Sequence, residues 1–117
     1  MGGLYMSVYE KWNAAREKMD VDAWASLLHH DYTFVRHQSN TTVPRDEWIK
    51  MATGMFEAMK DGKMKFHSSR CLYENQDILV QHDLIGFPDG SKEAVIGVHN
   101  LKDGKIIKTE TGATLIK

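Results

Sequence analysis

The chain has 117 residues, of which 42% are hydrophobic and 26% charged, and this length predicts a single domain spanning residues 1–117 with one core. A net charge of −1 without any basic run gives no electrostatic reason to expect nucleic acid as a partner. No apolar run approaches the ~20 residues of a membrane span, and the lone Cys71 and the lack of a secretory signal favour a cytoplasmic location.

Two helices are predicted at the start of the chain. The first runs from Ser7 to Met19 and opens with a capping box, because Glu10 follows Ser7 by three residues. It carries one apolar stripe that includes Trp12. The segment Asp20-Val21-Asp22 interrupts this pattern and caps a second helix, which we expect from Ala23 to about His30.

A short strand and a third helix follow. Residues 31–37 alternate between apolar and polar side chains and predict a strand, and the polar residues 38–42 predict a turn. The third helix starts at Pro44, with acidic residues in its first turn, and ends at Asp61-Gly62. Its broad apolar face includes Trp48, Met51 and Met55.

The second half of the chain predicts four consecutive antiparallel strands. Their expected ranges are Met64–Tyr73, Ile78–Gly86, Glu93–Leu101 and Ile106–Ile116. Two-residue loops are expected at Asn75-Gln76, Asp89-Gly90 and Asp103-Gly104, since Asp-Gly between alternating runs is a strong hairpin signal. Helices followed by such a meander indicate the α+β class.

These loop lengths fix a register, and the register places most of the polar strand residues on one face. The predicted polar face carries His67, Ser69, Cys71, His82, His99, Lys108 and Glu110, beside Val80, Leu84, Val95 and Leu101. The predicted apolar face carries Phe66, Leu72, Leu79, Ile85, Ile96, Val98 and Ile107. A single β-bulge would move the side chains of one strand to the other face.

Three histidines and a carboxylate on adjacent strands suit an acid/base or proton-relay site. Each histidine alone is as often an exposed surface residue. A metal site formed by His67, His82, His99 and Glu110 is a third interpretation, but these strands contain no short ligand spacing, so we expect no metal.

Three stretches resemble the SnoaL-like group of the nuclear transport factor 2-like superfamily, which includes the ketosteroid isomerases. They are Lys18-Met19-Asp20-Val21-Asp22-Ala23-Trp24, Leu27-Leu28-His29-His30-Asp31 and Leu101-Lys102-Asp103-Gly104-Lys105-Ile106-Ile107. The resemblance implies a cone-shaped α+β barrel, with three N-terminal helices packed on a strongly twisted, mainly antiparallel sheet. It also implies a pocket and a homodimer formed through the sheet. Trp12, Arg36 and Gly97 match the positions of the three catalytic groups of ketosteroid isomerases, so none of those groups is present.

The resulting hypothesis is a pocket for a small apolar or aromatic ligand. His82 would act as acid or base, His99 or Glu110 would orient it, and Arg36 or the Trp12 indole would stabilise an oxyanion. The predicted substrate-binding residues are Trp12, Tyr32, Phe34, Trp48, Met51, Met55 and His67. The reaction would be an isomerisation, dehydration or cyclisation of a small apolar carbonyl compound, without a cofactor. The alternative is a homodimeric module that binds a small ligand without turnover, and the sequence leaves open whether the protein is an enzyme.

Overall fold

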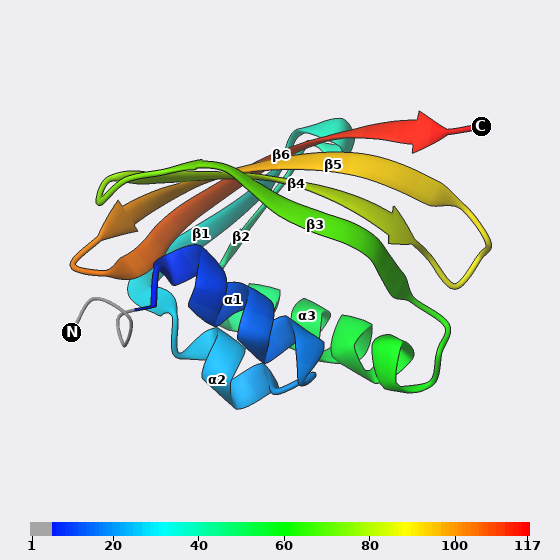
Figure 1. The fold of residues 1–117 in the computed structure, drawn as a ribbon, viewed down its shortest axis with the longest axis horizontal. Coiled ribbons are helices and arrows are strands. Elements are labelled where there is room, and N and C mark those ends of the chain that lie inside the picture. Colours follow the sequence, from blue (N-terminus) through cyan, green and yellow to red (C-terminus); the bar gives the residue numbers. More distant parts are fainter. Residues whose placement is uncertain (1–5) are drawn as a thin grey trace.

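The computed structural model describes residues 6–117, arranged as a layer of helices beneath a curved sheet (Figure 1). The N-terminal stretch in which we expect no secretory signal lies largely outside these residues. The helices are α1 (Val8–Glu17), α2 (Val21–Ala25) and α3 (Arg45–Lys60), with a short 3-10 helix at His37–Ser39. The strands are β1 (Leu28–Arg36), β2 (Thr41–Pro44), β3 (Lys65–Glu74), β4 (Ile78–Gly86), β5 (Lys92–Lys102) and β6 (Lys105–Ile116).

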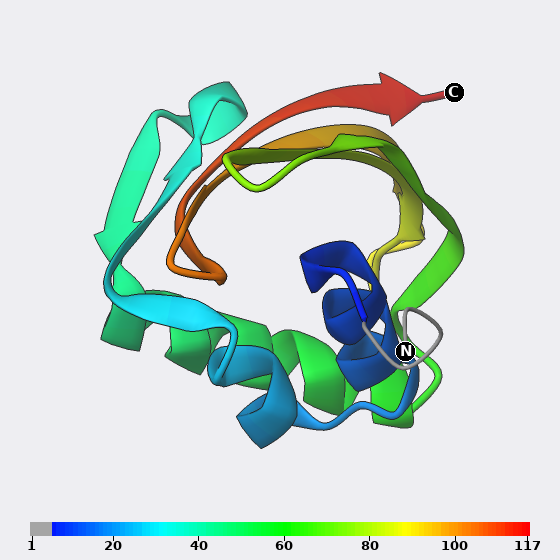
Figure 2. The same ribbon diagram turned by 60° about the vertical axis from the view of Figure 1, so that its left-hand side comes forward.

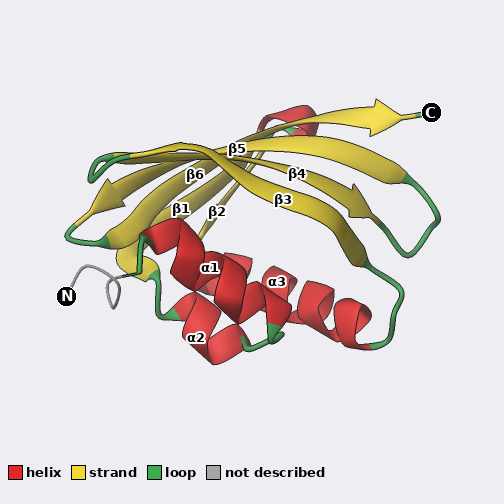
Figure 3. Cartoon of the chain, viewed as in Figure 1, coloured by secondary structure: helices red, strands yellow, loops and turns green. Residues whose placement is uncertain are grey.

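One sheet contains all six strands, in the order β2-β1-β6-β5-β4-β3. All neighbouring pairs are antiparallel except β1 and β6, which run parallel. The three helices lie on the concave side of the sheet (Figures 2 and 3). The expected α+β cone, with helices packed on a mainly antiparallel sheet, is therefore confirmed.

The start of α1 is fixed by two sets of hydrogen bonds. The predicted capping box is present, because Glu10 N donates to Ser7 Oγ at 3.1 Å and Ser7 N donates to Glu10 Oε1 at 2.8 Å. The next free N–H groups, of Val8 and Tyr9, donate to the Glu74 carboxylate at 3.0 and 3.3 Å. Glu74 ends β3, so these bonds attach α1 to the edge of the sheet.

The second helix is shorter than the sequence predicts. It ends at Ala25, and His29 and His30 lie in β1 instead of closing a helix. The strand begins early because Leu28 pairs with Ile106 of β6, and Ile106 N donates to Leu27 O at 2.8 Å. This distant pairing outweighs the local helical periodicity.

The strand β2 is also absent from the sequence prediction, which assigned Thr41 and Thr42 to a turn and Pro44 to the third helix. Its β-branched residues pair antiparallel with β1, from Thr41 opposite Arg36 to Pro44 opposite Thr33. Pro44 then caps α3, which otherwise begins and ends as predicted.

The predicted register of β4 against β5 is wrong by one residue. The connection is a five-residue loop from Phe87 to Ser91, closed by a hydrogen bond from Phe87 N to Ser91 O, and not the two-residue loop expected at Asp89-Gly90. His82 therefore lies opposite Ile96, and Gln81 lies opposite Gly97. Because side chains alternate, this shift puts His82 and His99 on opposite faces.

Bulges change the face of the sheet on which side chains of β3 and β6 lie. The pairing of β5 with β6 skips Ile107, and the pairing of β3 with β4 skips His67 and Leu72. The turn at Asp103-Gly104 has the expected positive φ at both residues, but the bulge just beyond it moves Lys108 and Glu110 to the outer face. The structure therefore divides the residues of each predicted face between the inner and the outer face of the sheet.

An aromatic core fills the space between the layers. Trp24 of α2 contacts Phe56 and Trp48 of α3, with ring centroids 5.7 and 6.2 Å apart. Phe34 of β1 stacks on Trp48 at 3.7 Å with a 4° angle between the ring planes. Within the described residues, no helix is long and apolar enough to cross a membrane.

Candidate functional site

A cavity of about 150 Å³ lies between the concave face of the sheet and the helices. Its wall is mostly apolar and is contributed by all three helices and by strands β1, β3, β4, β5 and β6. The aromatic members are Trp12, Trp24, Tyr32, Phe34, Trp48, Phe56, Phe66 and Phe87. A largely apolar hollow with a few polar groups is the usual form of a small-molecule site.

Four buried polar side chains along the sheet form one hydrogen-bonded chain in this wall. Thr109 Oγ1 lies 2.7 Å from His99 Nδ1, and His99 Nε2 lies 2.9 Å from Gln81 Oε1. Gln81 Nε2 in turn donates to Asp83 Oδ2 at 2.9 Å. Because Gln81 presents its carbonyl oxygen to His99, the imidazole must carry its proton on Nε2 and accept from the Thr109 hydroxyl at Nδ1.

Burial determines the charge of His99. Its pKa is lowered from 6.5 to about 4 because burial disfavours the charged imidazolium. The ring is therefore neutral at neutral pH, and both nitrogens are occupied by hydrogen bonds. His99 is suited to holding Gln81 in one orientation and has no free nitrogen with which to accept a substrate proton.

Asp83 ends the chain and has one oxygen free. Burial raises the pKa of its carboxyl group above the usual value, and the nearby Ser69 hydroxyl, the Gln81 amide and the positive charge of Arg16 partly offset this effect. Oδ1 is buried and has no hydrogen-bond partner, and the Ser69 hydroxyl lies 2.9 Å from the Tyr9 hydroxyl instead. A carboxylate with a raised pKa and an unused lone pair is typical of a general base.

A second unpartnered polar atom belongs to the same cavity wall. Arg16 of α1 lines the cavity, and its Nε is buried without a hydrogen-bond partner. Its Nη2 donates to Asn13 Oδ1, and its Cζ lies 4.6 Å from the centre of the Phe66 ring. The cation is thus held against an aromatic face at the edge of the cavity.

A wider hollow adjoins the cavity and shares Phe34, Trp48 and Phe87 with it. At this junction Arg36 Nη2 lies 3.4 Å from both carboxylate oxygens of Glu93 and donates to Gln38 Oε1 at 2.7 Å. The opposite charges of Arg36 and Glu93 leave this junction, which we call the entrance to the cavity, with a net charge close to zero.

The structure brings many of the predicted site residues to the cavity. The predicted residues that line the cavity are Trp12, Tyr32, Phe34, Arg36, Trp48, Met55 and His99. Met51 lines only the outer hollow. The three positions that the resemblance matches to catalytic groups, Trp12, Arg36 and Gly97, all border this one cavity.

The remaining predicted residues do not reach the cavity. His82 lies on the outer face of β4, and Glu110 lies on the outer face of β6, where His37 Nε2 is 2.9 Å away. The His37 hydrogen bond and the Lys108 charge lower the pKa of Glu110. His67 is an exposed bulge residue at the edge strand. Neither the histidine cluster nor the metal set considered from the sequence is therefore assembled.

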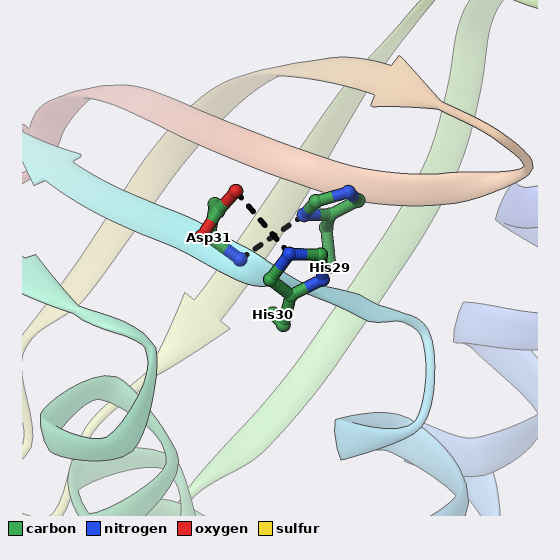
Figure 4. A group of neighbouring side chains, drawn as sticks. All are labelled: His29, His30 and Asp31. Atoms are coloured by element: carbon green, nitrogen blue, oxygen red, sulfur yellow. Dashed lines mark hydrogen bonds and ion pairs between the residues drawn. The ribbon is translucent and has the colours of Figure 1, made fainter.

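Another group of potential metal ligands lies at the start of β1 (Figure 4). Within residues 6–117, the ligand atoms of His29, His30 and Asp31 all lie within 4.8 Å of one another. Asp31 N donates to His29 Nδ1 at 3.0 Å, and His30 Nε2 lies 3.3 Å from Asp31 Oδ2. Since the Nδ1 lone pair is already used, the geometry favours local anchoring of the strand over metal ligation.

Sequence reasoning missed four polar residues of the site, Arg16, Gln81, Asp83 and Thr109. A usable signal was present in β4, where Leu79, Gln81, Asp83 and Ile85 alternate with outward residues and place a carboxylate between apolar positions. Arg16 lies one turn after Trp12 on the same helix face, which was the corresponding signal in α1.

A family model described as SnoaL-like domain matches residues 9–109. The chain therefore belongs to the SnoaL-like domain family, as its sequence resemblance indicated. No curated protein sequence matches the chain.

Solved structures with the same fold share little sequence with this chain. An NTF2-like protein of unknown function from Cytophaga hutchinsonii superposes with a TM-score of 0.72 at 14% identity, covering 92% of this chain and 87% of that one. A Kribbella flavida protein named "putative ketosteroid isomerase" gives 0.73 at 13% identity, covering 94% and 77%. IdmH of Streptomyces antibioticus, named "a putative polyketide cyclase", gives 0.67 at 13% identity, covering 91% and 88%. At these identities the likeness establishes the fold alone.

Proposed function

We propose that the protein binds a small, mostly apolar carbonyl compound in this cavity and moves a proton on it, with Asp83 as the general base. The observation that carries the proposal is the free Oδ1 of Asp83, a buried carboxylate oxygen without a partner in an otherwise apolar wall. A base in such a place reacts with a bound molecule and is shielded from bulk water.

The hydrogen-bonded chain supports this role by fixing the carboxylate. Gln81 occupies Oδ2, and neutral His99 holds Gln81 in the orientation that donates to Asp83. These two residues are positioning residues in the proposal. They leave one oxygen to take the proton from the substrate carbon and return it to another carbon.

The raised pKa of Asp83 also fits the task, because it brings the basicity of the carboxylate closer to neutral pH. Two of the structural neighbours are named "putative ketosteroid isomerase" and "a putative polyketide cyclase". Their names agree with the proposal but say nothing of the substrate of this chain.

The test uses cyclohex-3-enone, a one-ring ketone whose protons between the carbonyl and the double bond are acidic. Abstraction of one of these protons and its return to the far alkene carbon gives cyclohex-2-enone, whose conjugation is followed by ultraviolet absorbance. We expect the wild-type protein to accelerate this isomerisation and Asp83→Asn to lose about a hundredfold or more of the rate. The matched control is His82→Asn, the neighbouring residue on the opposite face, which should keep the wild-type rate.

Equal rates for the wild type and Asp83→Asn would overturn the catalytic role. If saturable binding of the ketone persisted without isomerisation in any form, the second candidate function, a binding module without turnover, would replace it. The apolar cavity suits both a substrate and a ligand that is bound without turnover. Binding is therefore measured separately, by quenching of tryptophan fluorescence.

We further propose that two copies associate through the outer face of the sheet. Ile96 is 43% exposed at the middle of this face, flanked across the strands by His82 and Gly112. An exposed apolar side chain on a sheet face suits a two-fold contact with the same surface of a second copy. Sedimentation should give a dimer for the wild type and a 13.4 kDa monomer for Ile96→Lys, and a monomeric wild type would contradict the proposal.

A further inference from the structure

We propose that Arg16 receives the carbonyl oxygen of the ligand, so that the cavity selects a one-ring compound with an enolisable carbonyl group. This inference rests on the proposed function and names the substrate class and the residue that would recognise it. Two buried polar atoms without hydrogen-bond partners belong to residues of the same cavity wall.

Among the described residues, only two buried side-chain polar atoms have no hydrogen-bond partner, Arg16 Nε and Asp83 Oδ1. Both residues line the same cavity, one from α1 and the other from β4. Native proteins rarely leave such groups unpaired, because each one loses its hydration without compensation. A ligand that offers an acceptor to the cation and a proton to the carboxylate satisfies both groups together.

The charge of Arg16 is not neutralised by a close carboxylate. Within the described part of the chain, no ion pair includes Arg16, and Asp83 senses its charge without direct contact. Contact with Phe66 and Trp12, at 4.6 and 5.8 Å from Cζ to the ring centres, restricts the guanidinium. A restricted cation with a free donor is suited to binding an oxygen that carries or develops negative charge.

The proton transfer and the charge fit these positions. When Asp83 takes a proton from the carbon beside the carbonyl, the C–H bond breaks and an O–H bond forms on the carboxyl group. The C–H electron pair forms a carbon–carbon double bond, and the π pair of the carbonyl group moves onto the oxygen, where the guanidinium would stabilise the negative charge. Both unpaired atoms are buried in the free protein, so each has already lost its hydration before a ligand binds.

The size of the cavity limits the ligand to about one ring. A dry protein cavity of about this volume, 150 Å³, is known to accept a benzene-sized molecule. The entrance is near neutral because Arg36 faces Glu93, so Arg16 is the better placed of the two arginines to meet an oxyanion inside.

The test uses 4-nitrophenol, a one-ring probe whose anion resembles an enolate and absorbs visible light. It is added to Asp83→Asn, in which the neutral amide represents the carboxyl group after it has taken the proton. We expect the bound probe to ionise at a lower pH than the free probe. In Asp83→Asn/Arg16→Met the ionisation constant of the bound probe should fall by roughly tenfold to a hundredfold. Arg16→Lys in the same background should restore part of the effect, and thermal unfolding confirms that each variant is folded.

The outcomes separate this inference from the proposed function. If the probe binds with the same ionisation constant with and without Arg16, Arg16 only packs against Phe66, and the inference is wrong while the cavity remains a binding site. If the probe binds to none of the folded variants, the proposed function fails and the inference fails with it.

Discussion

The two faces of the sheet carry similar residues in opposite circumstances. On the inner face, His99 is buried and neutral, and Asp83 has a raised pKa. On the outer face, His82 is half-exposed, and Glu110 has a lowered pKa beside His37. The chemistry of these side chains is therefore set by strand facing, and the facing depends on one loop and three bulge residues.

The sharpest way to test this contrast is to replace the side chains of two neighbouring β4 residues, Asp83 and His82, by an amide. Asp83→Asn should lower the rate of ketone isomerisation by about a hundredfold or more, whereas His82→Asn should leave it within about twofold. Initial rates at saturating ketone measure both. Equal losses in the two variants would mean that the faces do not differ in function.

The next largest effect is the acid sensitivity conferred by His99. The folded protein keeps this imidazole neutral down to about pH 4, whereas the unfolded chain binds a proton below about pH 6.5. The stability from the neutral ring is therefore complete above pH 6.5 and is lost as the pH falls toward 4. The loss amounts to about 3 kcal/mol, since one pKa unit is worth about 1.4 kcal/mol.

Urea unfolding of wild type and His99→Gln at pH 7 and pH 4 measures this effect. The difference in unfolding free energy between the two proteins should shrink by about 3 kcal/mol on acidification. The comparison uses a variant because Asp83 titrates with the opposite sign over part of the range. A difference that did not change with pH would contradict the buried, neutral state of His99.

A smaller effect should come from Asp83 itself. Its pKa is raised in the fold, so the ionised carboxylate costs stability above that pKa, and the cost vanishes below the usual value of 3.8. Asp83→Asn should therefore have a higher melting temperature than the wild type at pH 7 and lose this advantage near pH 3.8. An amide can still accept from Gln81, which makes it a mild replacement. A lower melting temperature at pH 7 would show that the carboxylate is stabilising after all.

The smallest effect is expected on the outer face. Glu110 is partly exposed beside His37 and Lys108, and solvent and salt screen such contacts. In the monomeric Ile96→Lys background, Glu110→Gln should leave the urea midpoint unchanged at low and at physiological salt. A clear destabilisation would indicate that the outer cluster is coupled to the core, and the distinction between the faces would weaken.

Much of the fold followed from the sequence, but the polar part of the site did not. The helical stripe with Trp12, the helix with Trp48 and Met55, and the turn at Asp103-Gly104 are strong local signals, and the structure contains all of them. The predicted facing of the β4 side chains was wrong because Phe87–Ser91 forms a longer loop than the Asp-Gly pair alone suggests. The bulge at Ile107 depends on tertiary contacts and leaves no local signature in a single sequence.

The parallel pairing of β1 with β6 has a consequence for how the molecule folds. The meander β3 to β6 consists of neighbouring hairpins and can assemble by local contacts. Leu28, in contrast, must find Ile106 near the far end of the sequence, so this pairing closes a longer loop than any other strand pairing among the described residues. Non-local pairings of this kind slow folding, and we expect this step to come late, with β1 and β2 joining a sheet that has already formed. Until that step the cavity lacks Tyr32 and Phe34, so the ligand site would be completed by the last event of folding.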